Sequence, residues 1–270
     1  MVDVVRKNQV VVRGKGSQPM LFAHGYGCDQ NMWRWVAPAF EATHRVILFD
    51  HVGAGRSDLT YYEPDKYASL DGYATDILEI CEELSLRNII FVGHSVSAMI
   101  GVIAAKRRPD LFAHLILIGP SARYINDGPY RGGFEAKDID GLIEQLDSNY
   151  LGWSRAITPV IMGNADRPSL TEELADSFCR TDPTIAKAFA RVTFLSDNRA
   201  DLAGVTTPAL VLQCSDDVIA PETAGRFVHE QLTGSQFVQM RATGHCPNLS
   251  APDETVAAIR RYLHGKAASR

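Results

Sequence analysis

The segment Gly93-His94-Ser95-Val96-Ser97 joins an apolar run at residues 89–92 to a stretch of helical pattern that contains Met99 and Ile103. A sharp turn from a strand into a helix exposes a serine hydroxyl at the edge of a sheet, and small neighbours allow close packing there. The N-terminus of the helix also favours developing negative charge. This context predicts a nucleophilic Ser95. A structural role remains the alternative, because serines in such turns are often helix caps and Ser97 stands where the general motif has glycine.

A serine hydroxyl is a weak nucleophile, so it needs a base, and the base needs an acid that orients it. His245 lies in a turn after a strand predicted at residues 236–240, and Asp217 lies four residues after a strand predicted at 209–213. Open α/β sheets hold their sites at the carboxyl ends of strands, where both residues stand. We therefore predict His245 as the base and Asp217 as the acid. Asp216 is the rival acid, and the spacing favours Asp217.

An oxyanion formed at Ser95 would need hydrogen-bond donors. The loop His24-Gly25-Tyr26-Gly27 follows a strand predicted at residues 20–23, and Val96 directly follows the nucleophile. In a strand–turn–helix site of this kind, such positions supply two backbone N–H groups, so Tyr26 and Val96 are the predicted oxyanion hole. A plain glycine-rich turn is the alternative at residues 24–27. The turn at residues 50–57 completes no phosphate-binding motif and is interpreted as structural.

Aromatic and aliphatic residues between positions 123 and 220 are candidates for a substrate pocket, since pockets are lined mostly by such side chains. The competing interpretation is that they form the core of that region. No His or Cys spacing is typical of a metal site, and no cofactor is expected. The predicted pocket residues are Phe134, Leu142, Trp153, Ile157, Phe189, Phe194 and Ile219.

Apolar runs alternate with helical patterns in the first 120 residues and again after residue 207, which predicts βαβ units and a mostly parallel sheet flanked by helices. Helical patterns alone occupy the part between, with expected helix starts at Ser169 and at Asp182-Pro183. We therefore predict an α/β core domain from residues 1–122 and 198–270 and a helical cap from residues 123–197. The strands are expected at residues 10–12, 20–23, 46–49, 89–92, 115–118, 209–213 and 236–240.

Composition narrows the function classes. The 270 residues include 46% hydrophobic and 22% charged ones, which is ordinary for a globular protein. The net charge of −5 makes nucleic acid a poor partner. The longest apolar stretch, residues 89–105, is interrupted by polar residues and too short for a membrane span. Five widely spaced cysteines and an N-terminus without a signal-peptide pattern favour a cytoplasmic protein.

With these residues assembled, the chain resembles the α/β-hydrolase superfamily, and more narrowly the RsbQ group and the related plant karrikin and strigolactone receptors. The resemblance runs almost end to end. It implies a four-helix cap over a hydrophobic cavity, a triad of Ser95, Asp217 and His245, and a signalling role. In the RsbQ group that role is upstream of a PAS-domain phosphatase in a bacterial stress response. The matching segments include residues 24–30, 45–50, 91–97, 107–112, 132–134, 149–153, 178–183 and 244–247.

The predicted function is hydrolysis of a small, largely apolar ester or lactone by a serine hydrolase that serves signalling. One alternative is a binding protein with slow turnover that acts through a protein partner. Another is a different hydrolase chemistry, such as carbon–carbon bond hydrolysis or haloperoxidase activity. Dehalogenation is disfavoured, because residue 95 is serine and not aspartate.

Overall fold

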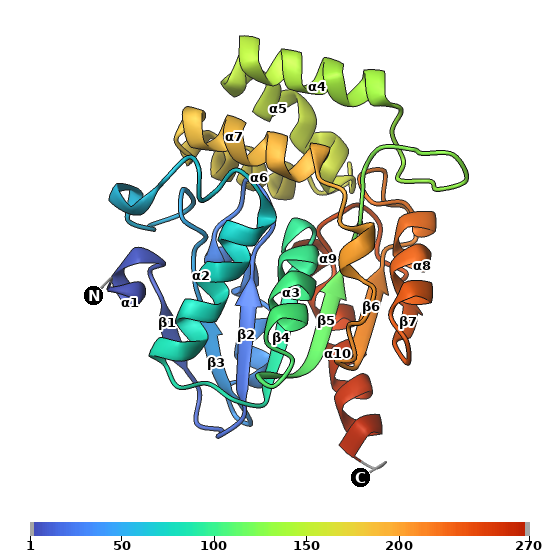
Figure 1. Cartoon of the computed structure of the whole chain (residues 1–270). Coiled ribbons are helices and arrows are strands. Elements are labelled where there is room, and N and C mark those ends of the chain that lie inside the picture. The colour runs from blue at the N-terminus through green and yellow to red at the C-terminus, as the bar shows by residue number, and fades with distance from the viewer. Residues whose placement is uncertain (1–2, 268–270) are drawn as a thin grey trace.

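A seven-stranded sheet forms the centre of the computed structural model, which describes residues 3–267 (Figure 1). The strand order is β1-β3-β2-β4-β5-β6-β7, and every neighbouring pair is parallel except β1 with β3. The sequence therefore predicted the sheet and its mostly parallel character. The strands are β1 Val11–Arg13, β2 Pro19–Ala23, β3 Arg45–Leu48, β4 Ile89–His94, β5 Phe112–Ile118, β6 Ala209–Gln213 and β7 Gln236–Gln239.

Helices cover both faces of this sheet. In Figure 1, α2 and α3 lie in front of the strands and α10 lies behind them. Burial on both faces explains why β2, β4 and β6 are continuous apolar runs rather than alternating ones. The helices of the core are α1 Val4–Lys7, α2 Leu70–Glu83, α3 Val96–Arg107, α8 Glu222–Gln231, α9 Pro247–Ser250 and α10 Pro252–Ala267, and the 3-10 helices are η1 Gln30–Trp33, η2 Ala37–Phe40, η3 Leu59–Tyr61 and η4 Arg199–Asp201.

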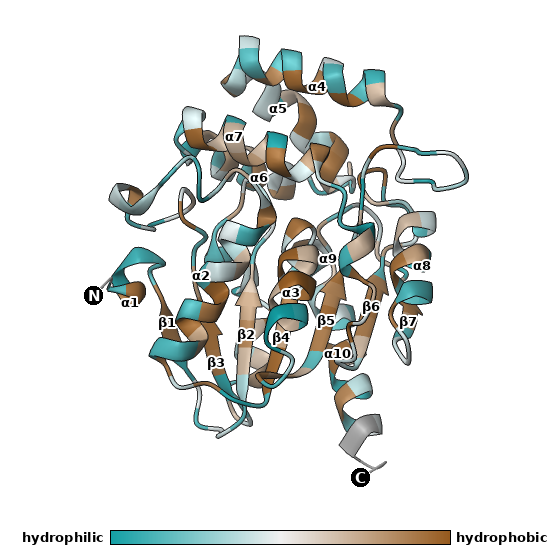
Figure 2. Ribbon diagram, in the orientation of Figure 1, coloured by the Kyte–Doolittle hydropathy of each residue, from teal (hydrophilic) through white to brown (hydrophobic). Residues whose placement is uncertain are grey.

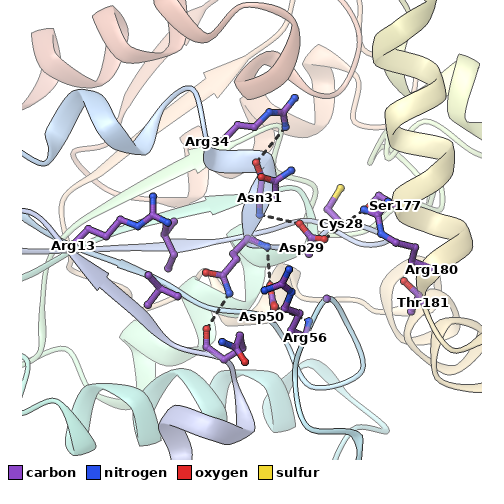
Figure 3. A pocket seen from close by; sticks show the side chains of 15 residues that line it. Arg13, Cys28, Asp29, Asn31, Arg34, Asp50, Arg56, Ser177, Arg180 and Thr181 are labelled. Atoms are coloured by element: carbon purple, nitrogen blue, oxygen red, sulfur yellow. Dashed lines mark hydrogen bonds and ion pairs between the residues drawn. The ribbon is translucent and has the colours of Figure 1, made fainter.

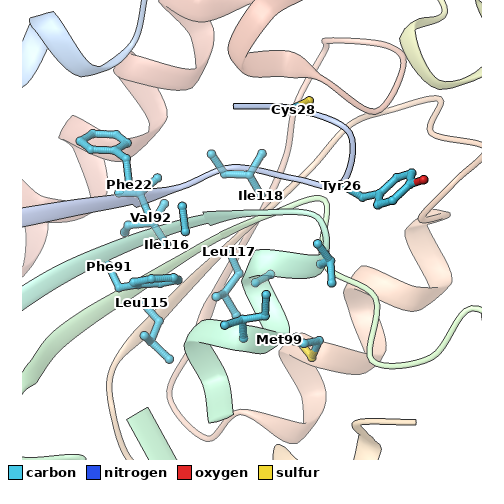
Figure 4. Packing of buried hydrophobic residues seen from close by; sticks show 14 of the residues in the cluster. Phe22, Tyr26, Cys28, Phe91, Val92, Met99, Leu115, Ile116, Leu117 and Ile118 are labelled. Atoms are coloured by element: carbon cyan, nitrogen blue, oxygen red, sulfur yellow. The ribbon is translucent and has the colours of Figure 1, made fainter. Parts of the chain in front are cut away.

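The hydrophobic core lies between the central strands and these helices. Figure 4 shows Phe22 of β2, Phe91 of β4 and Leu115 of β5 packed within it. Hydrophobic residues concentrate on the strands and on the inward faces of the helices, while hydrophilic residues colour the outer faces (Figure 2). This packing fixes the carboxyl ends of β4, β5, β6 and β7, from which the loops of the site emerge. None of the helices built by residues 3–267 combines the length and the apolar composition needed to cross a bilayer.

Four helices between β5 and β6 lie above the carboxyl ends of the strands (Figure 1). They are α4 Ala136–Ser148, α5 Tyr150–Met162, α6 Pro168–Arg180 and α7 Pro183–Leu195. The start of α7 is as predicted, since the Asp182 side chain accepts hydrogen bonds from the N–H groups of Thr184 and Ile185. The predicted cap at Ser169 is wrong. Helix α6 begins at Pro168, because proline suits a first turn, and Arg167 provides no side-chain cap.

The chain enters and leaves the helical region at one place. Arg123 and Asp197 form an antiparallel bridge, and the N–H of Asn198 donates to the carbonyl of Ala122 at 2.7 Å. The Arg123 guanidinium also lies 2.6 Å from the Asp197 carboxylate. The division at residues 122/123 and 197/198 stays a prediction, and these paired backbones are where we propose to draw it. We use "cap" below for residues 123–197.

Candidate active site

Ser95 stands between β4 and α3 in a strained backbone conformation, with φ 57° and ψ −124°. Its N–H donates to the carbonyl of Ile118 at 2.8 Å, which ties the turn to β5. Close packing requires Gly93, because a Cβ atom there would lie 2.6 Å from the carbonyl oxygen of Ser97. A non-glycine residue with positive φ costs free energy and persists only where its surroundings enforce it. The strand-to-helix turn therefore holds the hydroxyl of Ser95 at the edge of the sheet.

The three residues of the predicted triad lie together. The Oγ atom of Ser95 is 2.7 Å from Nε2 of His245, and Nδ1 of His245 is 2.7 Å from Oδ2 of Asp217. A carboxylate accepts hydrogen bonds, so Nδ1 carries the hydrogen and Nε2 is left to accept the proton of Ser95. All three residues are buried, with 4–6% of their surface exposed. This arrangement can transfer a proton from a serine hydroxyl to an imidazole and stabilise the resulting imidazolium.

Backbone contacts hold the acid and the base in place. The Oδ1 atom of Asp217 accepts from the N–H groups of Ile219 and Ala220 at 2.9 and 3.0 Å, so the carboxylate presents only Oδ2 to His245. Asp216 is exposed and binds through its backbone, with its carbonyl accepting from the N–H of Gly244. Neighbouring side chains of this loop point apart, and the one that reaches the imidazole belongs to Asp217.

The cap contributes to the position of His245. The N–H of His245 donates to the carbonyl of Ile161 in α5 at 2.8 Å. Gly244 precedes it with φ 74°, and a Cβ atom on Gly244 would lie 2.0 Å from the carbonyl oxygen of Met162. Only glycine allows the loop to approach the end of α5 this closely. Any movement of α5 would therefore displace the imidazole of His245.

His94 supports the imidazole from the core. Burial, together with the neighbouring His245, lowers the pKa of His94 to about 3. His94 is consequently neutral, and its Nε2 atom donates to the carbonyl of His245 at 2.7 Å. This residue binds the backbone of the predicted base and leaves the ring of His245 free for Ser95 and Asp217.

The backbone N–H group of Tyr26 lies in the loop after β2, and that of Val96 lies at the first residue of α3, directly after Ser95. Within residues 3–267, neither group donates a hydrogen bond to another part of the chain. The side chain of Tyr26 is held independently, because its hydroxyl donates to the carbonyl of Ala186 in α7. Two unused N–H groups at the start of α3 and in the preceding loop are what an oxyanion requires, although their role stays a prediction.

A second serine–histidine contact lies deeper in the core. Ser97 Oγ donates to the carbonyl of His24 at 2.5 Å and also lies 2.8 Å from Nε2 of His51. Because the Ser97 proton is already donated, Nε2 of His51 is the donor of that contact. Burial lowers the pKa of His51 well below its usual value, and no carboxylate contacts its ring within the described residues. This pair joins the loop of Tyr26 to α3.

An apolar cavity of about 30 Å³ lies above Ser95 and His245. Its volume is close to that of one or two water molecules, so the cavity has no room for an organic substrate in this structure. Cap helices supply much of the wall, and the hydroxyl of Tyr124 lies 3.5 Å from the Oγ atom of Ser95. Burial raises the pKa of Tyr124 to about 12, which keeps the phenol protonated. The lining residues are Tyr26, Cys28, His94, Ser95, Tyr124, Ile161, Leu174, Phe178, Thr193, Phe194, Ile219, His245 and Cys246.

Two of the seven predicted pocket residues, Phe194 and Ile219, line this cavity. The other five do not line it. The ring of Trp153 lies against those of Tyr26 and Phe178, at centroid distances of 6.3 and 6.1 Å. Phe189 stacks on Tyr73 of α2 at 4.3 Å. The remaining three, Phe134, Leu142 and Ile157, are partly buried against the hydrophobic core.

Sequence reasoning did not single out several lining residues. Tyr124 could have been found, since it follows β5 at the carboxyl edge of the sheet, as Asp217 and His245 follow theirs. Leu174 and Phe178 are one turn apart on α6, a spacing that also fits a helix packed on its own neighbours. Nothing in the sequence distinguishes those two cases.

Comparison with known proteins gives one consistent result. The model of the "Alpha/beta hydrolase family" matches residues 20–258. Karrikin insensitive 2 receptor CA of Petunia hybrida is 37% identical over 97% of both chains, and strigolactone esterase D14 of Arabidopsis thaliana is 38% identical over 97% of this chain and 98% of its own.

A solved structure is equally similar. The structure of a hydrolase from Oleispira antarctica superimposes with a TM-score of 0.94 at 40% identity, and the match covers 97% of this chain and 96% of that one. The sequence similarity and the structural similarity both extend over nearly the whole chain. The chain therefore belongs to the alpha/beta hydrolase family, and its similarity to a plant karrikin insensitive 2 receptor and to a plant strigolactone esterase runs almost from end to end.

Proposed function

We propose that this chain is a serine hydrolase of a small, largely apolar ester or lactone and that its reaction serves signalling. The observation that carries the proposal is the pair of 2.7 Å contacts that link Ser95, His245 and Asp217 beneath an apolar cavity. Similar proteins bear the names receptor and esterase, which supports the combination of ligand binding with ester cleavage.

In the proposed reaction, Oγ of Ser95 attacks the substrate carbonyl carbon while Nε2 of His245 takes the hydroxyl proton. The N–H groups of Tyr26 and Val96 donate to the oxyanion of the tetrahedral intermediate. Asp217 stabilises the imidazolium, which then protonates the departing alkoxide. The acyl group remains on Ser95. His245 next removes a proton from water, the hydroxide attacks the acyl carbon, and Ser95 is released with its proton restored.

Replacement of Ser95 tests the nucleophile. We expect Ser95→Ala to lower kcat for p-nitrophenyl acetate by at least about 10²-fold, since loss of a triad serine removes the attacking atom. The thermal melt should stay close to that of the unchanged protein. Intact mass measured after exposure to a fluorophosphonate should show one adduct on the unchanged protein and none on Ser95→Ala.

Two results would refute this assignment. One is an adduct on the Ser95→Ala protein, and the other is a loss of kcat smaller than about 10²-fold. Ser121→Ala is the matched control, because this serine is also buried but its hydroxyl donates to the carbonyl of Arg123 rather than to a histidine. It should retain both the adduct and the activity.

A second candidate function is ligand binding with slow turnover, and the small volume of the cavity, about 30 Å³, favours it. A substrate larger than a few atoms can enter only if the cap moves, and opening or product release can then limit the rate. Rapid mixing with p-nitrophenyl acetate separates the two functions. A burst of nitrophenol followed by a much slower steady rate, or a slow steady rate without a burst, supports the slow binder, whereas a fast single steady rate supports the plain enzyme.

We further propose that the signal passes to a protein partner, as in the RsbQ group, where the partner is a PAS-domain phosphatase. Support comes from the resemblance of residues 149–153 and 244–247 to that group. The test is calorimetric titration of a PAS-domain phosphatase into Ser95→Ala with a butenolide present or absent. Binding that requires the butenolide supports the proposal, and no binding in either condition refutes this partner.

A further inference from the structure

A groove of about 700 Å³ lies outside the active site, between the β1 edge of the sheet, η1 and cap helix α6 (Figure 3). Ser95 and His245 are not among its lining residues. The groove is lined by four arginines, which are Arg13 from β1, Arg34 after η1, Arg56 from the loop after β3, and Arg180 at the end of α6. Figure 3 shows their side chains on different sides of the groove. In a protein with a net charge of −5, this gathering of cations is unexpected.

The two acidic residues in the groove already have donors. Asp50 is buried, and its carboxylate accepts from the N–H groups of Gln30 and Arg56 at 2.8 and 2.9 Å. The carboxylate of Asp29 accepts from the N–H of Asn31 at 2.8 Å. These carboxylates therefore shape the loops around the groove, and much of their accepting capacity is used by backbone N–H groups.

The arginines differ in their partners. Arg34 lies 2.7 Å from Glu173, and Arg180 lies 3.6 Å from Asp29. The guanidinium groups of Arg13 and Arg56 have neither an ion-pair partner nor a hydrogen-bond acceptor anywhere in residues 3–267. Both are exposed along the groove. Two free guanidinium groups, with a third held only loosely, give the groove a positive charge that the protein does not neutralise.

We propose that this groove binds a small phosphorylated molecule of nucleotide size. Guanidinium groups match the geometry of phosphate oxygens and bind them in pairs of parallel hydrogen bonds. Several arginines around one groove suit a group with more than one negative charge. The volume of about 700 Å³ exceeds what a lone phosphate needs and falls within the usual range for organic ligands. The binding proposed here does not rest on the hydrolysis proposed for Ser95.

Helix α6 connects the groove to the active site. Leu174 and Phe178 of this helix line the cavity above Ser95, while Ser177 and Arg180 line the groove. Ser177 donates to the carbonyl of Gly27 in the loop of the predicted oxyanion hole. A phosphorylated ligand that contacts Arg180 together with Arg13 or Arg56 would join the cap to the core. We infer that the bound ligand holds α6 against the core and slows opening of the cap.

The test is calorimetric titration of the full chain with pyrophosphate and with ADP, and sulfate at equal ionic strength serves as a nonspecific reference. The double variant Arg13→Gln/Arg56→Gln should bind both at least about tenfold more weakly, because charge-assisted hydrogen bonds to phosphate are lost. Arg261→Gln is the matched control, since Arg261 is exposed on α10, outside the groove. It should bind as the unchanged protein does.

Absence of saturable binding of both probes to the unchanged protein would overturn the proposal, as would equal affinity of the double variant. Hydrogen exchange tests the effect on the cap. Pyrophosphate should slow exchange of the α6 amides in the unchanged protein and leave it unaltered in the double variant. Binding without any change in α6 exchange would overturn the inferred link to the cap. Ser95→Ala should bind the probes normally, so failure of the catalytic proposal is distinguishable from failure of this one.

Discussion

Ser95 and Ser97 are separated by one residue, and each lies within 2.8 Å of Nε2 of a histidine. The two pairs differ in where the hydrogen atoms are. Asp217 holds the hydrogen of His245 on Nδ1, so Nε2 can take a proton from Ser95. In the other pair, Ser97 donates to the carbonyl of His24, so Nε2 of His51 must itself be a donor. One pair can activate a hydroxyl, and the other can only hold a loop.

The surroundings of the two pairs differ as well. Ser95 and His245 line the apolar cavity, whereas Ser97 and His51 are fully buried and absent from its wall. The Ser97 hydroxyl joins the His24 loop to α3, which helps to fix the N–H of Tyr26 near the nucleophile. Proximity of serine to histidine therefore does not identify a catalytic pair. Whether a serine–histidine pair can be catalytic depends on the third partner that binds the histidine and on the access of substrate to the serine.

The substitution Asp217→Asn should remove the difference between the two serine–histidine pairs with the largest effect on activity. An asparagine amide can donate to Nδ1, which moves the ring hydrogen to Nε2 and gives His245 the hydrogen-bonding pattern of His51. We expect kcat for p-nitrophenyl acetate to fall by about 10⁴-fold, the effect of the same change in another triad. Asp216→Asn is the control and should retain nearly full activity, because its side chain is exposed and does not reach the imidazole. Equal losses in both variants would contradict the assignment of Asp217.

A smaller effect is expected from Ser97→Ala, which removes the hydroxyl of the second pair. The carbonyl of His24 and Nε2 of His51 would then be buried without this partner, at a cost of about 1–3 kcal/mol in the free energy of unfolding. Chemical denaturation measures that loss. The kcat per folded molecule should change far less than in Ser95→Ala. An unchanged melt combined with a loss of kcat as large as that of Ser95→Ala would make Ser97 the catalytic serine.

Local signals were sufficient to predict the sheet and to bring Ser95, His245 and Asp217 to one edge. Continuous apolar runs such as residues 209–213 mark buried strands, and β6 has those bounds. Each of the three residues follows a strand directly or within a short loop, so the topology alone carries them to the same place. The role of Ser97 was missed, because its small size explained its presence and its two hydrogen-bond partners lie 46 and 73 residues away.

The cavity wall was much harder to predict. Trp153, Ile157 and Ile161 lie on one helix, yet only Ile161 lines the cavity, since the end of α5 approaches His245. Which turn of a helix approaches the site depends on how the cap helices pack on one another and on the core. That packing is set by contacts between distant segments, such as the ring of Trp153 against Tyr26. Composition and residue spacing therefore do not indicate how the cap helices pack.

The smallest expected effect concerns protonation of the second pair. Burial lowers the pKa of His51 well below 6.5 and that of His94 to about 3, so both are neutral when folded. Unfolded histidines titrate near pH 6.5, so below that value the unfolded chain binds more protons than the folded one. The free energy of unfolding should therefore decrease as the pH falls below about 6, with a limiting slope of about 1.4 kcal/mol per pH unit for each histidine that stays neutral in the folded chain. His51→Gln should reduce this pH slope by the contribution of one histidine, as measured by denaturant titrations at several pH values. If His51→Gln and the unchanged protein gave the same slope, His51 would titrate alike in both states, and its burial in a purely structural pair would no longer explain the difference from His245.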